Sequence, residues 1–185
     1  MNRIHLAGAT IALGLSVSAT SALACNPFFH SPNMKVSPQA AEIVARAKDD
    51  GSMTSDTPPS ERTIVGMWHT VHSDSSGTPF LETIDQWHED GTELEYANLP
   101  PAVGPTCLGV WQKVGPYSAQ LYHTTFFYSP QGDFQGTMQL RATYKVGRDG
   151  NTYQGAFEEK DYDPKGKLMA DTTGSVHAVR IVPTQ

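Results

Sequence analysis

The last third of the chain, residues 117–182, contains four stretches in which apolar and polar side chains alternate. A period of two is typical of β-strands that bury one face. Three short turns separate the stretches, and each turn carries a glycine, at Gly132, Gly150 and Gly166. Glycine supplies the positive φ that tight reversals between antiparallel strands require. The pattern therefore predicts an antiparallel meander of four strands.

Counting outward from each turn predicts which residues lie opposite one another, and opposed residues share a face of the sheet. The first turn places Tyr122 opposite Leu140, the middle turn places Val146 opposite Tyr153, and the last places Tyr153 opposite His177. One face then collects apolar side chains: Tyr122, Phe126, Met138, Leu140, Tyr144, Val146, Tyr153, Phe157 and Met169. The other face collects His123, Gln139, Arg141, Lys145, Gln154, Glu158, Lys160 and Arg180. Hydrophobicity assigns the first set to the interior, although an apolar outer face would also allow self-association into a homo-oligomer.

Earlier in the chain, four more strands are expected at residues 63–72, 80–88, 92–98 and 107–114. A short amphipathic helix is expected between Ser37, a favourable N-cap, and Asp49. No other helical pattern interrupts the strands. Eight antiparallel strands with short connections can close into a barrel and so remove exposed edges. The predicted fold is all-β, an eight-stranded antiparallel meander barrel with one short N-terminal helix.

The N-terminus has the pattern of a secretory signal peptide, with Arg3 before an apolar run and Ala22-Leu23-Ala24 at the cleavage site. We therefore expect a signal peptide at 1–24, an N-terminal segment with the short helix and a linker at 25–62, and the barrel domain at 63–185. Such a protein would be periplasmic or secreted.

The chain contains two cysteines, Cys25 and Cys107. In an exported protein this even count predicts one disulfide bond. An alternative is that Cys25, which would be the first residue after cleavage, carries a lipid.

The Gly66-x-Trp68 pair at the start of the first strand resembles the motif of the lipocalins and wider calycins. The resemblance implies that the tryptophan closes one end of the barrel, and Arg180 on the last strand is the candidate to cover it. A similar pair, Gly109-x-Trp111, follows 43 residues later and suggests two related halves. The architecture is also similar to allene-oxide-cyclase-like and dirigent-like barrels.

The 185 residues carry a formal net charge of −6, which disfavours nucleic acid and anionic membranes as partners. The sequence has no nucleotide loop, zinc-ligand spacing or nucleophile elbow. We therefore expect no cofactor, no metal, no nucleic acid and no membrane span. Trp87 shares a strand face with Asp85, Glu93 and Glu95, so we expect it to be partly exposed.

Two sets of residues are candidates for chemistry. If the apolar face is interior, the predicted register brings Glu159, Asp171 and His177 together, and burial of the two carboxyls would raise a pKa. If the other face is interior, the set is His123, Arg141 and Glu158. In either case, the alternative is an ordinary solvated surface.

Three functions fit these features. The first is an exported barrel that binds a small, largely apolar or aromatic molecule, with a lining of Tyr122, Phe126, Tyr144, Tyr153 and Phe157. The second is a cofactor-independent isomerase or cyclase that uses an interior histidine or carboxylate as acid and base. The third is a structural or interaction module whose barrel is filled by its own side chains.

Overall fold

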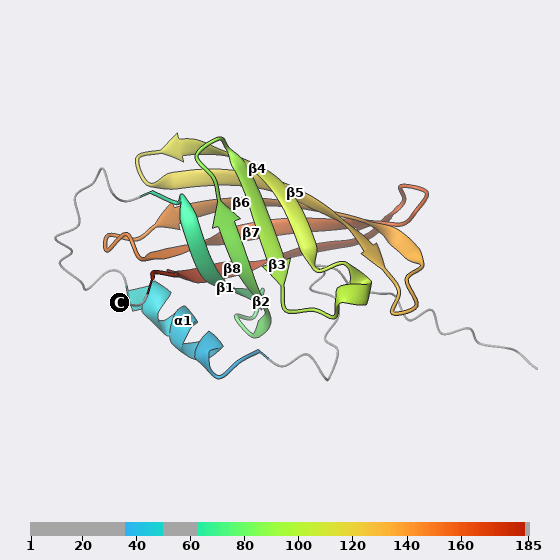
Figure 1. Ribbon diagram of the computed structural model, residues 1–185, viewed down its shortest axis with the longest axis horizontal. Coiled ribbons are helices and arrows are strands. Elements are labelled where there is room, and N and C mark those ends of the chain that lie inside the picture. Colours follow the sequence, from blue (N-terminus) through green and yellow to red (C-terminus); the bar gives the residue numbers. More distant parts are fainter. Residues whose placement is uncertain (1–35, 50–62, 184–185) are drawn as a thin grey trace, which may run out of the picture.

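A computed structural model of the chain describes residues 36–49 and 63–183 (Figure 1). Its strands form one closed antiparallel barrel in chain order, which confirms the predicted fold class. The strands are β1 (Gly66–Asp74), β2 (Pro79–Trp87), β3 (Thr92–Ala97), β4 (Thr106–Gly115), β5 (Ser118–Tyr128), β6 (Phe134–Val146), β7 (Thr152–Tyr162) and β8 (Leu168–Arg180). The described helices are α1 (Gln39–Lys48) and the single turn η3 (Pro101–Val103). This eight-stranded meander fits a calycin-like fold.

The four C-terminal strands are the longest, at 11 or 13 residues each, and extend past β1–β4 at one end of the barrel (Figure 1). Their side chains alternate strictly between buried and exposed positions along β5 and most of β6. Alternation of this kind is what the pleat of a half-buried strand imposes. The interior is therefore lined by every second residue of each strand.

The three turn-based registers do not all hold. The register from the middle turn is confirmed, since Val146 pairs with Tyr153. The registers from the other two turns are wrong by one residue: Tyr122 pairs with Arg141, and Tyr153 pairs with Ala178. In both hairpins a β-bulge lies beside the turn and adds one unpaired residue to the returning strand.

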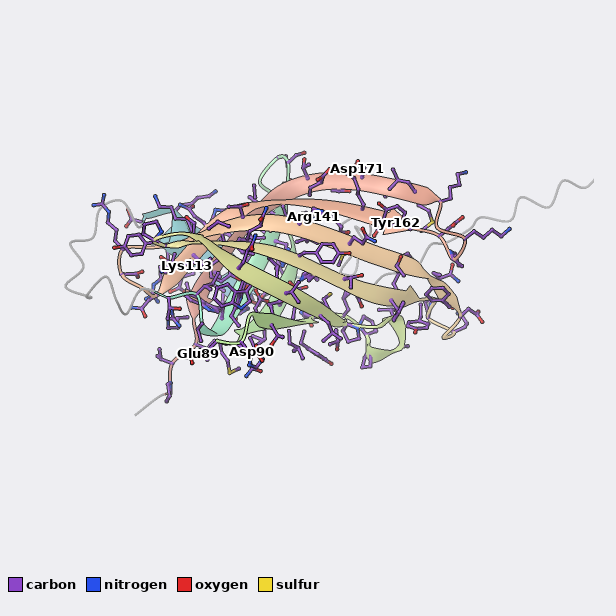
Figure 2. The ribbon with its side chains drawn as sticks, turned by 90° about the horizontal axis from the view of Figure 1, so that it is seen from above. Glu89, Asp90, Lys113, Arg141, Tyr162 and Asp171 are labelled. Atoms are coloured by element: carbon purple, nitrogen blue, oxygen red, sulfur yellow. The ribbon has the colours of Figure 1, made fainter. Side chains whose placement is uncertain are left out.

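Each one-residue shift moves side chains to the opposite face. Tyr122 and Phe126, which were expected in the interior, lie on the outer surface, and the Phe126 side chain is 61% exposed. His123, which was expected outside, is buried inside the barrel. Asp171 is exposed on the outer surface, as are Arg141 and Glu158. Figure 2 labels Arg141 on β6 and Asp171 on β8, the two long strands on either side of β7.

One end of the barrel is closed around Trp68. The indole is fully buried and its Nε1 donates a hydrogen bond to the carbonyl oxygen of Ile64 at 2.7 Å. The Arg180 guanidinium lies over the ring, with its Cζ 4.0 Å from the ring centroid. Gly66 has φ 130°, and a Cβ there would lie 2.6 Å from Arg180 Nη1. The absent side chain at Gly66 therefore makes room for the arginine.

Helix α1 covers the outside of the barrel at β1 and β8. Ala40 and Ile43 pack against Val71, with Val179 beside them. His177 pairs with Val71 across the strands, and its side chain points outward on the side that α1 covers. The predicted grouping of His177 with Glu159 and Asp171 is therefore wrong, because His177 and Asp171 lie outside the barrel and Glu159 lies inside.

Several predictions concern residues outside the described ranges. The signal peptide at 1–24 and the cysteine at position 25 belong to this group, so the cleavage site, the disulfide bond and the alternative lipidation all stay predictions. Cys107 is buried in the barrel interior. Neither helix in the described part of the chain is long and apolar enough to cross a membrane.

Candidate ligand site in the barrel interior

Three carboxyl groups from adjacent strands meet inside the barrel. Asp85 on β2 pairs directly with Glu95 on β3, and Glu93 lies two residues before Glu95 on the same face. Each residue is 3% exposed. One carboxylate oxygen from each lies within 4.8 Å of the other two. We call Asp85, Glu93 and Glu95 the carboxyl cluster.

Two histidines contact this cluster. The Nδ1 atom of His123 lies 3.5 Å from Glu93 Oε2, and the Nε2 atom of His72 lies 3.3 Å from Glu95 Oε2. All four side chains are almost completely buried. Both contacts are long or poorly directed for hydrogen bonds, so the attraction within each pair is mainly electrostatic. The cluster therefore contains buried acids and bases in pairs.

Gly109 allows one of these pairs to form. It lies on β4 between Glu93 on β3 and His123 on β5 in the same cross-strand row. A Cβ at Gly109 would lie 2.4 Å from Glu93 Oε2 and 2.9 Å from the His123 Cβ. Any side chain there would displace the carboxylate or the imidazole. Gly109 thus opens the space in which Glu93 meets His123.

Asp85 is held in place by hydroxyl donors. Thr83 Oγ1 donates to Asp85 Oδ1 at 2.6 Å, and Thr70 Oγ1 donates to Asp85 Oδ2 at 2.7 Å. The Tyr153 hydroxyl donates to the same Oδ2. These three hydrogen bonds fix the carboxylate orientation and leave a lone pair on Oδ1 for a further partner.

The environment shifts the acidity of the cluster. Burial raises the pKa of Asp85, and it raises the pKa of Glu93 to about 7. Burial alone would lower the pKa of His123, but the neighbouring Glu93 and Glu95 carboxyls raise it to about 9. Burial would likewise raise the pKa of Glu95, yet the His72 imidazole holds it below its ordinary value. Near neutral pH, Glu93 is therefore partly protonated and His123 carries a proton, so the interior contains groups that can exchange protons.

Aromatic rings fill the barrel between the cluster and its closed end. Trp87 makes edge-to-face contacts with Tyr144 at 5.6 Å and with Tyr153 at 6.1 Å between centroids. Tyr153 packs edge-on against Trp68 at 4.8 Å. Trp87 is 1% exposed, so the expectation that it is partly exposed is wrong. This end is filled by its own side chains.

Apolar side chains and further acids surround the rest of the interior. The Phe157 ring lies 5.8 Å from the His72 ring, and Met138 and Leu140 are buried on the neighbouring strand. Glu159 is buried on the same face as Phe157, and its pKa is raised well above the ordinary value by burial and by the nearby Asp161 and Glu95 carboxyls.

Several polar atoms of this interior have no hydrogen-bond partner within the described residues. They include Glu93 Oε2, Glu95 Oε1, Glu159 Oε1, His72 Nε2 and both ring nitrogens of His123. A buried polar group without a partner costs about 1–3 kcal/mol, and more when it is charged. Such a concentration of unmet hydrogen-bonding capacity marks a place where a ligand can bind.

The predicted site residues are thus divided between two sides of the barrel wall. Tyr144, Tyr153, Phe157, Glu159 and His123 lie inside. The carboxyl cluster and His72 were missed as candidates, because acids that alternate with apolar residues on β2 and β3 were interpreted as facing solvent. One residue could have indicated the site from the sequence: Gly109, which has no side chain and so leaves room for the Glu93 carboxylate.

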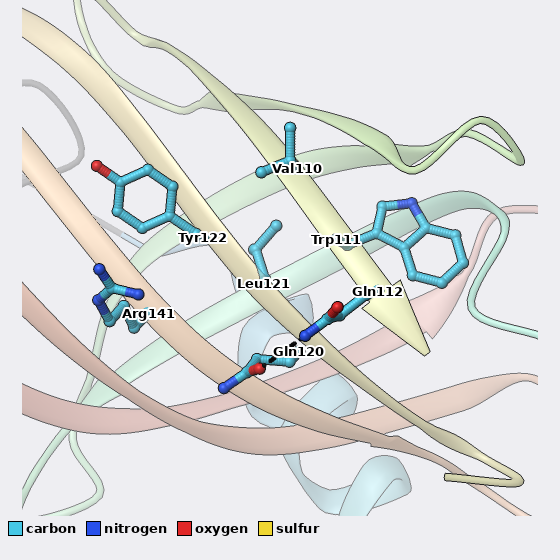
Figure 3. Close-up of a pocket in the computed structure, with 7 residues that line it drawn as sticks. All are labelled: Val110, Trp111, Gln112, Gln120, Leu121, Tyr122 and Arg141. Atoms are coloured by element: carbon cyan, nitrogen blue, oxygen red, sulfur yellow. Dashed lines mark hydrogen bonds between the residues drawn. The ribbon is translucent and has the colours of Figure 1, made fainter. Parts of the chain in front are cut away.

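A hollow also lies on the outer surface of β4–β6 (Figure 3). Its volume is about 230 Å³, and its lining includes Val110, Tyr122 and Arg141. The Arg141 guanidinium stacks on Tyr122 at 4.8 Å, and Gln112 Nε2 donates to Gln120 Oε1 at 3.3 Å. These groups satisfy one another at the surface, so the hollow lacks the unpartnered buried atoms of the interior.

Comparison with known proteins adds little to these observations. No protein-family model matches the chain, and no curated protein matches its sequence. Among solved structures, an S-type phycobiliprotein lyase from Guillardia theta is similar over 75% of this chain and 98% of its own, with a TM-score of 0.31 and 12% sequence identity. A similarity this low carries no argument about function.

Proposed function

We propose that the barrel binds a small organic molecule in its interior. The ligand has an apolar or aromatic body that packs near Phe157 and a polar group that satisfies the interior acids and histidines. One observation carries the proposal: buried carboxyl and imidazole atoms in the centre of the barrel lack hydrogen-bond partners within the described residues.

The energetics support this proposal, because buried polar groups without hydrogen bonds destabilise the folded protein. A barrel interior filled with apolar residues would avoid the cost of burying each unpaired polar atom, which is about 1–3 kcal/mol. A bound molecule recovers that cost by forming the missing hydrogen bonds. A small number of placed polar groups beside apolar walls is also the usual composition of a small-molecule site. The predicted export would place this binding activity in the periplasm or outside the cell.

Fluorescence titration with N-phenyl-1-naphthylamine, a neutral apolar dye with one N–H donor, tests the proposal. Protein treated with EDTA should bind the dye saturably. Phe157→Leu should weaken dye binding by about tenfold, because an aromatic wall is lost. Phe126→Leu is the matched control, since Phe126 lies on the outer surface, and it should leave binding unchanged. Absence of saturable binding would instead support a barrel filled by its own side chains.

A second candidate, acid/base catalysis without a cofactor, is favoured by one feature. Glu93, with its pKa raised by burial to about 7, lies beside His123, so one group can accept a proton while the other donates. Once a natural ligand is captured, mass spectrometry after incubation with the protein decides between the two. Conversion that Glu93→Gln abolishes would indicate an enzyme. Recovery of unchanged ligand between about pH 5 and 9 would leave binding alone.

A further inference from the structure

The carboxyl cluster has the composition of a metal site. Its three members supply carboxylate oxygens that lie within 4.8 Å of one another. Ligand atoms bound to one ion at about 2.0–2.2 Å must lie within about 4.4 Å of one another, so small side-chain rotations would suffice. Acidic residues often gather without binding an ion, however, and the cluster alone would not establish a site.

His123 provides the independent observation. Its imidazole is 1% exposed, and neither ring nitrogen has a hydrogen-bond partner within the described part of the chain. Nδ1 lies 3.5 Å from Glu93 Oε2, and the ring also places a nitrogen within 4.8 Å of a Glu95 oxygen. The imidazole thus makes no hydrogen bond within the described residues, and it is directed at Glu93 Oε2, which also accepts none, so His123 has the orientation of a metal ligand.

The carboxylates of the cluster are also oriented by residues around them, as metal ligands usually are. Thr83 and Thr70 donate hydrogen bonds to the two oxygens of Asp85, and His72 lies 3.3 Å from Glu95. Metal-binding carboxylates are usually oriented in this way by a surrounding layer of hydrogen-bonding groups. Gly109 contributes as well, since its lack of a side chain leaves the space between Glu93 and His123 open.

We propose that Asp85, Glu93, Glu95 and His123 bind one divalent first-row transition-metal ion inside the barrel. Mixed carboxylate and imidazole ligands suit Zn²⁺, Mn²⁺ and Fe²⁺, whereas Ca²⁺ prefers oxygen ligands alone. A divalent cation would also neutralise carboxylates that are kept away from water. This proposal differs from the expectation from the sequence that the protein binds no metal. The inference does not depend on the binding of an organic molecule.

Zinc titration of the full-length protein tests this inference. After EDTA treatment and dialysis, calorimetric titration with ZnCl₂ and elemental analysis should give one ion per chain, and CaCl₂ should bind far more weakly. Glu93→Gln, Glu95→Gln and His123→Gln should each weaken zinc affinity by at least about tenfold. The same substitutions away from the cluster, Glu158→Gln on the outer surface and His88→Gln in the turn between β2 and β3, control for adventitious binding and should have no effect.

Stoichiometric binding that only the interior substitutions weaken supports the site. Absence of stoichiometric binding overturns it, and so does binding that only the surface substitutions weaken or that the interior substitutions leave unchanged. Circular dichroism and thermal unfolding in EDTA verify that each variant is folded. Since zinc is titrated without dye and the dye is titrated in EDTA, failure of the metal site and failure of the organic-ligand site give different results.

Discussion

Replacing Arg180 with methionine should open the closed end of the barrel and destabilise the protein. The guanidinium donates three hydrogen bonds: Nε to the carbonyl of Gly150 at 2.8 Å, Nη1 to that of Val65 at 2.8 Å, and Nη2 to that of Thr63. It also lies over the Trp68 ring at 4.0 Å. Methionine keeps the aliphatic stem and removes all of these contacts.

The magnitude follows from what each lost contact leaves behind. Gly150 is buried, so its carbonyl loses a donor that water replaces poorly, at about 1.5–3 kcal/mol for a charged donor. Val65 and Thr63 are more accessible, and water can satisfy their carbonyls. The cation–π contact adds about 1 kcal/mol. We expect a loss of about 2–4 kcal/mol in the free energy of unfolding, or a fall of about 5–15 °C in Tm.

Arg141→Met is the matched control. Arg141 also stacks on an aromatic ring, at 4.8 Å from Tyr122, but it lies exposed on the outer surface. Exposed contacts of this type contribute about 0.5–1 kcal/mol. Urea unfolding followed by tryptophan fluorescence measures both variants. If Arg180→Met and Arg141→Met lose the same stability within about 0.5 kcal/mol, the hydrogen bonds do not hold the barrel closed.

Two further predictions concern stability. In metal-free protein, the folded-state pKa of Glu93 is raised from 4.5 to about 7 by burial and that of His123 is raised from 6.5 to about 9 by the neighbouring carboxyls. The folded state then retains protons that the unfolded state releases, so stability should fall from about pH 5 to 9, and Glu93→Gln should flatten the part below about pH 7. A flat wild-type profile in urea unfolding would contradict this. Gly136→Ala should cost more than about 3 kcal/mol, because Gly136 has φ 150° and a Cβ would lie 1.9 Å from the Tyr162 carbonyl oxygen. Gly132→Ala, with φ 90° and open space around it, should cost only about 1–2 kcal/mol in thermal unfolding.

The fold could be predicted because its signals are local. Alternation and glycine-bearing turns define strands and their order, and both are visible in a few consecutive residues. The two β-bulges are harder to recognise in the sequence. In the β5–β6 hairpin, the unpaired bulge residue is Gln135, which precedes Gly136 with its positive φ. In the β7–β8 hairpin, the unpaired bulge residue is Met169. Because one residue reverses the faces, this small omission placed Tyr122 inside and His123 outside.

The site was harder to predict because polarity is inverted on part of the barrel. The acids of the carboxyl cluster, on β2 and β3, point inward, while Tyr96 on β3 and Leu108 and Val110 on β4 are 48%, 61% and 59% exposed on the outside. Hydrophobicity shows which face of a strand is interior only where the buried residues are selected for stability and have no other role. Burying Glu93 and Glu95 while exposing Leu108 is unfavourable on both sides of the wall, so stability does not account for this arrangement. The polar ligand and the metal ion proposed above would account for the inward acids. In that proposal, the sequence pattern that looked like a solvated surface is the pattern of a binding site.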